Sequence, residues 1–238
     1  MEDWKKSEGT FNLACDLERA SGMMQNTCVK IEHVTKRFGE DMVLQEVNLS
    51  LKTGNVYGIV GNNGSGKTVL MKCICGFLPV TTGTIFVFGK KIGHDVDFPE
   101  SLGVIIETPG FLTQYTGFKN LEILADMNGR ISKADIRIVL KRVGLNPDMK
   151  KPVGKYSLGM RQRLGIAQAI MEDPLFLILD EPFNGLDKHG VEEIRKILLE
   201  LKKAGKTILL ASHNEEDIRI LCDHVYEMDG GILRERTA

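Results

Sequence analysis

The sequence predicts an α/β fold with a mainly parallel sheet, a β-rich N-terminal part and a helical insertion. Residues 29 to about 91 alternate strand signals with turns, and residues from about 111 to 173 have the spacing of helices. The apolar run 56–60 leads through a glycine-rich loop into a helix-type segment. After residue 173 strand and helix alternate, a βαβ pattern that favours parallel strands. The elements expected there are a strand at 175–179, an amphipathic helix at 190–204, a strand at 207–211 and a helix at 215–222.

The first 27 residues lack this periodicity. We therefore expect residues 1–27 to form a non-core extension ahead of a domain covering 28–238, in which a helical subdomain occupies about 111–173. Met23 and Met24 stand just before the first strand-like segment, so a translation start at one of them is a hypothesis. An intact mass of the natively expressed protein that includes Met1 would reject it.

Composition excludes several classes of protein. The 238 residues are 42% hydrophobic, enough for a sizeable core. With 31 basic and 32 acidic residues the formal charge is −1, so no overall attraction to nucleic acid or anionic lipid is expected. No uncharged apolar run approaches the roughly 18 to 20 residues that cross a bilayer, and no signal peptide is evident. A function at a membrane would therefore require a separate membrane-spanning partner chain. The cysteines show no metal-binding or CxxC spacing and are expected to be reduced and structural; they lie at positions 15, 28, 73, 75 and 222.

Residues 61–68 read Gly-Asn-Asn-Gly-Ser-Gly-Lys-Thr and match the phosphate-binding pattern GxxxxGK(S/T) in the required strand-to-helix context. Backbone N–H groups and a helix N-terminus attract phosphate oxygens, the lysine neutralises their charge, and the threonine hydroxyl can reach magnesium. A glycine-rich turn that binds nothing is the alternative, but the four fixed positions and both flanks favour a nucleotide hydrolase. The predicted nucleotide-binding residues here are Gly61, Asn62, Asn63, Gly64, Ser65, Gly66, Lys67 and Thr68.

A second element of phosphate chemistry is the apolar strand at 175–179, which ends in two carboxylates, Asp180 and Glu181. Beside a phosphate loop, Asp180 would hold magnesium through its water shell and Glu181 would polarise the attacking water. By itself the pattern also describes a buried strand that reaches solvent. The phosphate loop in the same chain favours the catalytic interpretation.

The order of motifs over residues 29–234 resembles the nucleotide-binding subunit of ATP-binding cassette transporters. The motifs are the phosphate loop, a loop near 107, a signature at 156–160, the Asp-Glu strand, Asn184-Gly185-Leu186-Asp187, and His213. The resemblance implies a P-loop NTPase core with a mainly parallel sheet, an N-terminal antiparallel β subdomain and a helical subdomain insertion. In that family the signature of one subunit faces the ATP held by the phosphate loop of a second, so that two ATP molecules are sandwiched in a head-to-tail dimer.

In such a dimer Ser157 and Gly159 would contact the nucleotide from the opposite subunit, as donors at a helix N-terminus. For this segment taken alone, a simple capped helix is an equal alternative. The resemblance also implies that Phe38 stacks on adenine, that His213 contacts the γ-phosphate and orients Glu181, and that Asp187 contacts the second subunit; an ordinary turn residue is the alternative at the first and last of these positions. The remaining histidines are interpreted as structural: His33, His94, His189 and His224.

Two departures from the common family pattern are informative. The signature reads Tyr-Ser-Leu-Gly-Met where Leu-Ser-Gly-Gly-Gln is usual, and Glu107 stands where most members carry a glutamine that senses magnesium and the transmembrane partner. Glutamate keeps an oxygen ligand, adds a negative charge and loses the amide donor, so the expected metal ligands are Thr68, Glu107 and Asp180. In both departures the chain resembles the subgroup of cassettes that exports, or confers immunity to, bacitracin, lantibiotics and related peptides.

The resemblance therefore implies the ATP-hydrolysing subunit of an exporter, with ATP and Mg²⁺ as cofactors. Its partners would be an integral membrane permease and a second copy of itself or a paralogous cassette, and its place the cytoplasmic face of the cell membrane. One alternative is a soluble, non-transport cassette ATPase in a regulatory or nucleic-acid complex, but the segment between Lys67 and Asp180 leaves no room for a long coiled-coil or zinc insertion, and the chain carries only one such head. A non-enzymatic regulator that uses ATP only to dimerise would lack some of the key residues, all of which are present: Lys67, Asp180, Glu181 and His213.

Overall fold

A computed structural model describes residues 26–107 and 110–236. The expected N-terminal extension lies almost entirely outside these residues, as do Met23, Met24 and Cys15. None of the described helices is both long enough and apolar enough to cross a membrane.

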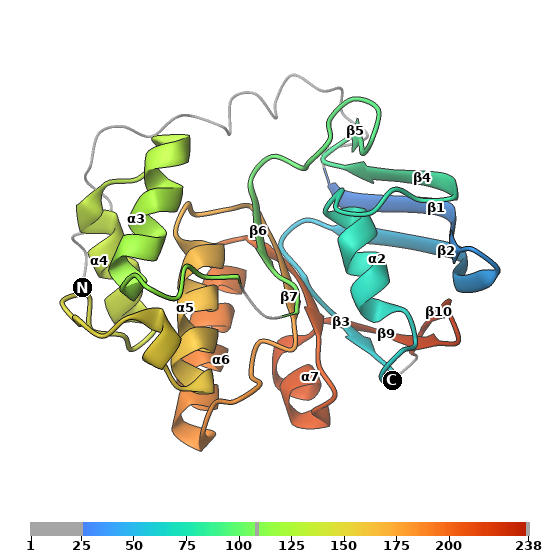
Figure 1. The fold of residues 1–238 in the computed structure, drawn as a ribbon. Coiled ribbons are helices and arrows are strands. Elements are labelled where there is room, and N and C mark those ends of the chain that lie inside the picture. Colours follow the sequence, from blue (N-terminus) through green and yellow to red (C-terminus); the bar gives the residue numbers. More distant parts are fainter. Residues whose placement is uncertain (1–25, 108–109, 237–238) are drawn as a thin grey trace.

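The first sheet is antiparallel throughout and is built from strands within residues 27–91. Its strands, in spatial order, are β2 (Asp41–Lys52), β1 (Thr27–Phe38), β4 (Thr82–Val87) and β5 (Lys90–Lys91). In Figure 1 this sheet lies at the opposite side of the molecule from the helices of the insertion. The expected antiparallel N-terminal part is confirmed.

The second sheet is parallel except at one edge, where a C-terminal hairpin pairs antiparallel. Its strands, in spatial order, are β10 (Ile232–Glu235), β9 (His224–Asp229), β3 (Val56–Val60), β8 (Thr207–Ala211), β7 (Phe176–Asp180) and β6 (Leu102–Ile105). Three strands that are far apart in the sequence, β3, β8 and β7, are neighbours at its centre. Their carboxyl ends therefore meet at one edge of the sheet, the usual ligand-binding edge of such folds.

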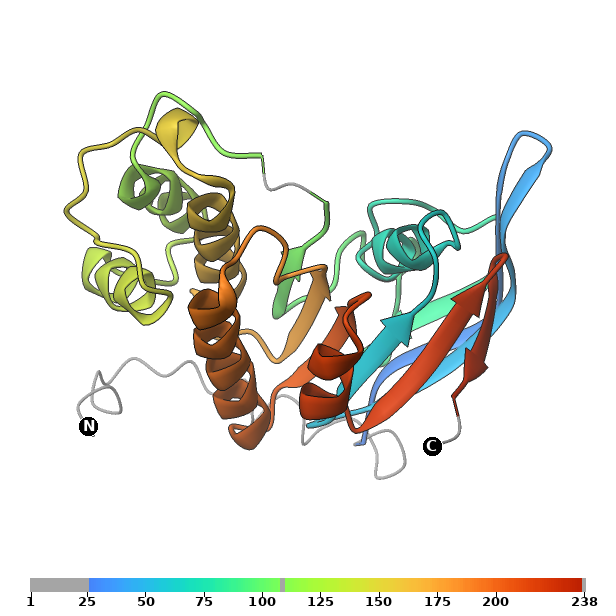
Figure 2. The same cartoon turned by 90° about the horizontal axis from the view of Figure 1, so that it is seen from below.

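The helices fall where the spacing predicts them. The insertion contains α3 (Gly117–Asn128), α4 (Lys133–Arg142), the short 3₁₀ helix η1 (Val153–Lys155) and α5 (Leu158–Ile170), all inside the range 111–173; the others are α2 (Lys67–Ile74), α6 (Lys188–Lys203) and α7 (Glu215–Leu221). Helix α6 begins two residues earlier than expected, because the Asp187 side chain accepts a hydrogen bond from the N–H of Gly190 at 2.8 Å and so caps the helix. Helices α2 and α7 lie on opposite faces of the parallel sheet (Figure 2).

One helix starts differently from the rest. Helices α3 to α7 each begin at a residue whose side chain accepts a backbone N–H: Thr116, Ser132, Ser157, Asp187 and Asn214. Helix α2 instead begins at Gly66, which offers no side-chain cap. The first N–H groups of α2 are therefore left for another partner, at the point where the sequence predicts bound phosphate.

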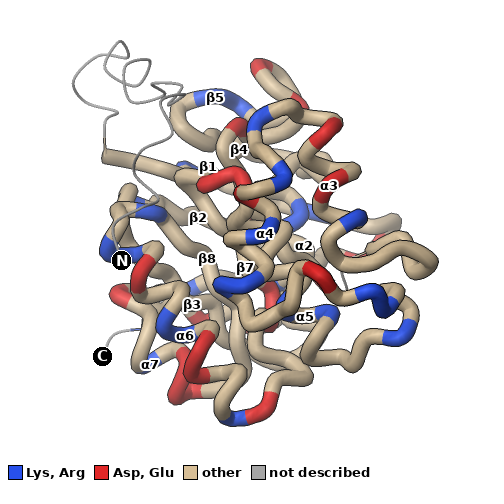
Figure 3. The backbone as a smooth tube through the Cα atoms, turned by 90° about the vertical axis from the view of Figure 1, so that its left-hand side faces the viewer, with Lys and Arg blue, Asp and Glu red and all other residues tan. Residues whose placement is uncertain are grey.

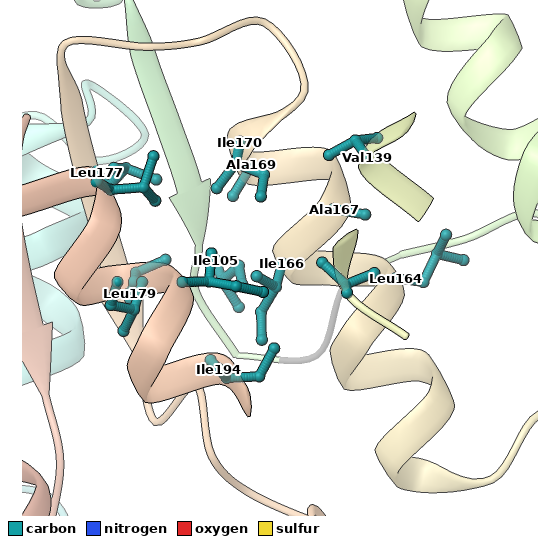
Figure 4. Packing of buried hydrophobic residues seen from close by; sticks show 14 of the residues in the cluster. Ile105, Val139, Leu164, Ile166, Ala167, Ala169, Ile170, Leu177, Leu179 and Ile194 are labelled. Carbon is teal, nitrogen blue, oxygen red and sulfur yellow. The ribbon is translucent and has the colours of Figure 1, made fainter. Parts of the chain in front are cut away.

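The core is divided by the parallel sheet into two clusters. Along β7, Leu177 and Leu179 pack on the side of α5 and α6, whereas Phe176 and Ile178 pack on the side of α2 and the antiparallel sheet. Figure 4 shows the first cluster, where Ile105 and Ile166 meet these leucines. Each fully buried aliphatic side chain contributes roughly 1.5–3 kcal/mol, so both faces of β7 fix its position. Outside the core, basic and acidic positions are interspersed over the face seen in Figure 3.

Candidate active site

The loop between β3 and α2, residues 61–66, has a backbone that depends on its glycines. Gly61 (φ 147°) and Gly66 (φ 111°) adopt angles in the left-handed region, which other residues rarely enter. A Cβ at Gly61 would collide with the carbonyl oxygen of Met228, and one at Gly66 would come within 2.9 Å of the carbonyl oxygen of Val43. The predicted tight turn is therefore present and lies directly against β9 and β2.

Lys67 opens α2 and folds back over this loop. Its Nζ donates to the carbonyl oxygens of Gly61 at 2.7 Å and Asn62 at 2.9 Å, and the residue is only 7% exposed. The Ser65 hydroxyl is buried and has no hydrogen-bond partner among the described residues. A fixed cation, a free hydroxyl and the open N-terminus of a helix together attract an anion. The loop thus fits the phosphate groups of a nucleotide.

The back of the loop is held by the C-terminal hairpin. The N–H of Gly231, in the turn between β9 and β10, donates to the carbonyl oxygen of Ser65 at 3.0 Å. Gln45 of β2 holds the same turn, because its side-chain amide donates to the Gly230 carbonyl at 2.7 Å and its backbone N–H to the Gly231 carbonyl at 2.9 Å. The shape of the phosphate loop therefore depends on the last strands of the chain.

Thr68 and Asp180, two of the three expected magnesium ligands, touch directly. The Thr68 hydroxyl, in the first turn of α2, donates to Oδ2 of Asp180, the last residue of β7, at 2.6 Å. Hydroxyl and carboxylate oxygens are ligands that magnesium prefers, so this pair fits the ion. Glu107 is placed differently: its Oε1 accepts a hydrogen bond from Nζ of Lys72 at 2.6 Å. The third expected ligand therefore has a cationic partner of its own.

Glu181 and His213, the expected catalytic pair, are also in contact. Nδ1 of His213 lies 2.8 Å from Oε2 of Glu181, across the ends of β7 and β8. Glu181 has a φ of 49°, which is uncommon for a residue with a side chain. Two hydrogen bonds hold it there: its N–H donates to the Ala211 carbonyl at 2.9 Å, and the Gln162 side chain donates to its carbonyl at 3.2 Å. The carboxylate is thus held at the end of the strand, next to the imidazole.

The signature segment lies at the N-terminus of α5. Ser157 caps this helix by accepting the N–H of Met160 at 3.2 Å. Gly159 approaches the carbonyl oxygen of Gly185 so closely that a Cβ would lie 2.7 Å from it, and the Leu158 side chain covers Gly185. The signature and the 184–187 loop therefore pack together within one chain. Leu158 nevertheless remains 60% exposed.

Phe38, expected to stack on adenine, is the last residue of β1. Its ring is exposed, and Nζ of Lys36 lies 4.8 Å from the ring centroid on one side. The same ammonium donates to the Pro79 carbonyl at 2.7 Å, which fixes it in place. The ring is therefore oriented by a cation and still open to a planar ligand.

Comparisons with known proteins decide the family. A family model described as "ABC transporter" matches residues 44–184. The chain belongs to the ABC transporter family. Within it, the cassette is an ATP-binding subunit and an ATPase.

Several curated relatives are similar over most of the cassette. The "Uncharacterized ABC transporter ATP-binding protein YybJ" of Bacillus subtilis is 43% identical over 205 residues, which are 86% of this chain and 94% of the relative. The "Bacitracin transport ATP-binding protein BcrA" of Enterococcus faecalis is 42% identical over 90% of this chain and 70% of its own length. The "Lantibiotic transport ATP-binding protein SrtF" of Streptococcus pyogenes is 36% identical over 87% of this chain and 90% of the relative.

Solved structures agree with the fold of the cassette. A structure described as a nucleotide-free ATP-binding cassette from an ABC transporter is 26% identical, with a TM-score of 0.76 over 88% of this chain and 90% of that one. Another, the ATP binding subunit of an ABC transporter, has a TM-score of 0.80 at 25% identity over 89% of this chain and 90% of that one. The predicted fold class is confirmed.

Two contacts of the cassette site were not predicted from the sequence. Lys72 contacts Glu107, and Gln162 contacts Glu181. Lys72 stands four residues after Thr68, so the helical repeat places both on one face of α2; that spacing could have identified the lysine. No comparable signal links Gln162 to residue 181, since the contact depends on how α5 packs against the end of β7.

The remaining histidines of the cassette lie at the surface, outside the site. They contact the carboxylates of Glu46, Asp95, Glu193 and Glu235 respectively: His33, His94, His189 and His224. The four described cysteines are free thiols, as expected. Burial raises their pKa to about 11 at Cys73 and about 12 at the other three, which keeps them protonated and inert.

Proposed function

We propose that this cassette hydrolyses ATP at the edge of its parallel sheet and so powers export of a peptide antibiotic or lantibiotic by a separate membrane permease. The observation that carries the catalytic half of this proposal is the pair of direct contacts, Thr68 with Asp180 and Glu181 with His213, beside the phosphate loop. The relatives named for bacitracin and lantibiotic transport support the cargo class. These relatives do not favour the non-transport alternative.

Nucleotide binding is assigned to the phosphate loop and its surroundings. Lys67 and the free N–H groups at the start of α2 would hold the β- and γ-phosphates, and the Ser65 hydroxyl would donate to them. Phe38 would stack on adenine, a role supported by its open ring. The remaining loop positions act through their backbone: Gly61, Asn62, Asn63, Gly64 and Gly66.

Magnesium would be held by Thr68 and Asp180, with Glu107 as a third ligand if it leaves Lys72. When bound, the ion neutralises charge on the phosphate oxygens. Glu181 would polarise the attacking water and accept its proton. His213 would fix the orientation of that carboxylate through the 2.8 Å contact and reach the γ-phosphate. Both residues lie just beyond the carboxyl ends of neighbouring strands, Glu181 after β7 and His213 after β8.

The second half of each ATP site would come from another cassette, either a second copy or a paralogue. Ser157 and Gly159 would contact the nucleotide held by that partner, and Asp187 would contact its phosphate loop. The exposed Leu158 supports such an interface, because a large apolar side chain beside the signature would be covered by it. We further propose that residues 28–238 act as one ATPase domain, with the helical subdomain at about 111–173.

Docking of the permease is assigned to the side of the molecule near Glu107. A hollow of about 150 Å³ lies there, lined in part by Phe77, residues 104–106 at the end of β6, and Gly165 of α5. Phe77 and Phe98 are both exposed and pack edge to face at 6.0 Å. This hollow, bordered by Phe77, the end of β6 and α5, would seat a cytoplasmic segment of the permease, and the cassette would then lie at the cytoplasmic face of the membrane.

The test is co-purification from the native host. Tagged Glu181→Gln protein should trap ATP, and gentle solubilisation of membranes should recover a multi-spanning hydrophobic protein with it. Lys67→Ala protein, made in parallel, controls for ATP-dependent association. A strain lacking the recovered permease should then become more sensitive to peptide antibiotics. Recovery of soluble protein or nucleic acid alone would refute the exporter proposal.

A further inference from the structure

Ser212, the residue before His213, is hydrogen-bonded to a buried ion pair. Asp217, in the first turn of α7, is 1% exposed, and its Oδ1 accepts a hydrogen bond from Nε of Arg195 on α6 at 2.7 Å. Its other oxygen, Oδ2, accepts the hydroxyl of Ser212 at 3.3 Å. Ser212 is 2% exposed and directly precedes His213. Both oxygens of a buried carboxylate are therefore used, one for each neighbour.

Asn214, the residue after His213, is also hydrogen-bonded to Ser212. The N–H of Asn214 donates to the Ser212 hydroxyl at 3.1 Å, and the Asn214 side chain caps α7 by accepting the N–H of Glu216 at 2.9 Å. The His213 side chain itself is 70% exposed, and its contact with Glu181 is a single one. Because little packs against the ring, its direction is set by the backbone on either side, and that backbone is fixed through Ser212.

We propose that Asp217, held by Arg195, is a positioning residue for ATP hydrolysis: through Ser212 it sets the backbone that directs His213 at Glu181. This inference rests on the roles proposed above for Glu181 and His213. A carboxylate fits this place because both of its oxygens accept from donors. Asparagine would keep its oxygen for Arg195 and turn its NH₂ toward Ser212, whose hydroxyl would then have to accept instead of donate. Arg195 belongs to the helix that Asp187 caps, so the support for His213 comes from the element that follows the 184–187 loop.

A purely structural role is the competing explanation, since an ion pair between α6 and α7 also joins the two helices. Ser212→Ala separates the two explanations. It removes the hydroxyl that connects Asp217 to the histidine backbone and leaves the Arg195–Asp217 pair intact. We expect kcat to fall about tenfold, while KM and the Kd for ATP stay close to wild type. Tm should fall by only a few degrees, because one buried oxygen of Asp217 loses its donor. Glu216→Gln is the matched control: it removes the exposed partner of Arg195 and should leave kcat unchanged.

Two further readouts follow the histidine itself. Nitrogen NMR of His213 should show a changed imidazole environment in Ser212→Ala and an unchanged one in Glu216→Gln. Asp217→Asn should lower kcat in the wild-type background, yet cause no further loss of kcat when His213 is already alanine, because residues that act through one another are not additive.

The outcomes separate the inference from the function on which it rests. If His213→Ala hydrolyses ATP at the wild-type rate, the proposed role of His213 is wrong and this inference fails with it. If His213→Ala is impaired but Ser212→Ala keeps wild-type kcat and the wild-type imidazole signals, the inference alone is wrong. An equal loss from Asp217→Asn with and without His213 would likewise assign the ion pair to structure and overturn the positioning role.

Discussion

The phosphate-loop end and the signature end of this cassette are both built at helix N-termini, but they are completed differently. At the start of α2, three contacts are already made within the chain: Lys67 contacts the carbonyl of Gly61, Thr68 contacts Asp180, and Glu181 contacts His213. At the start of α5, Ser157 and Leu158 face outward. The residues of the proposed chemical site thus meet within one chain, whereas the signature presents an exposed surface that we propose is covered by a second cassette.

The way each helix is capped explains this difference. Helix α2 begins at a left-handed glycine without a side-chain cap, so its first N–H groups stay free for an anion. Helix α5 begins at Ser157, whose hydroxyl already accepts the N–H of Met160. The first terminus therefore leaves backbone N–H groups open for a ligand, whereas the second is already capped by its own serine. Substitutions at the two ends should therefore have separable effects on ATP binding, turnover and dimer formation.

The largest expected effect comes from removing the proposed base at the phosphate-loop end. Glu181→Gln should lower the rate of phosphate release by about 100-fold or more, since positioned acid–base groups contribute roughly 10² to 10⁴. Binding of ATP should persist, and the trapped nucleotide should favour a dimer. Phosphate release, ATP affinity and light scattering measure the three quantities. Wild-type turnover in this variant would contradict the assignment of the base.

Lys67→Ala tests binding rather than chemistry at the same end. Loss of a hydrogen-bonded charge costs about 1.5–3 kcal/mol, so the Kd for ATP should rise roughly 10- to 100-fold. Fluorescent nucleotide titration measures it, and circular dichroism controls for folding. Unchanged affinity would mean that the phosphates bind somewhere other than the loop.

Ser157→Ala addresses the signature end. Turnover should fall about tenfold and the ATP-trapped dimer should weaken, while the Kd for ATP of the monomer stays unchanged. Ser132→Ala is the matched control, because Ser132 caps α4 in the same way. Both variants should lose about 1 kcal/mol of stability, but only the first should lose turnover. Equal turnover in the two variants would show that Ser157 only caps its helix and does not contact a nucleotide.

The smallest expected effect lies between the two ends, at the Lys72–Glu107 ion pair. Both side chains are partly exposed, so breaking the pair by Lys72→Gln should cost at most about 1 kcal/mol of stability. Freed from the lysine, Glu107 should turn to the metal, and the Mg²⁺ concentration that half-saturates ATP binding should fall two- to threefold. Glu107→Gln should have the opposite effect. If neither variant changes the Mg²⁺ dependence, Glu107 is not a ligand.

The sequence predicted motifs well and the contacts between them poorly. The phosphate loop and the Asp180–Glu181 strand could be located because each has a local physical signature, a glycine-rich turn and an apolar strand ending in acids. The approach of Glu181 to His213 was expected only from a family resemblance. The ion pairs Lys72–Glu107 and Arg195–Asp217 were missed. The spacing from Thr68 could have identified Lys72, but no local pattern connects Arg195 on α6 with Asp217 on α7, since that contact depends on how the two helices pack. Helix α6 was placed two residues late because the cap at Asp187 was not recognised.

The hairpin behind the phosphate loop has a consequence for biogenesis. Strand β3 pairs with β8 and β9, which are synthesised long after it, and the loop itself is bound by Gly231. The antiparallel sheet can form long before, because β1, β2 and β4 follow one another closely in the chain. The growing polypeptide therefore exposes an unpaired central strand until β8 and β9 have been made. Chains cut short before residue 231 should be targets for chaperones and proteases and should lack the ability to retain nucleotide.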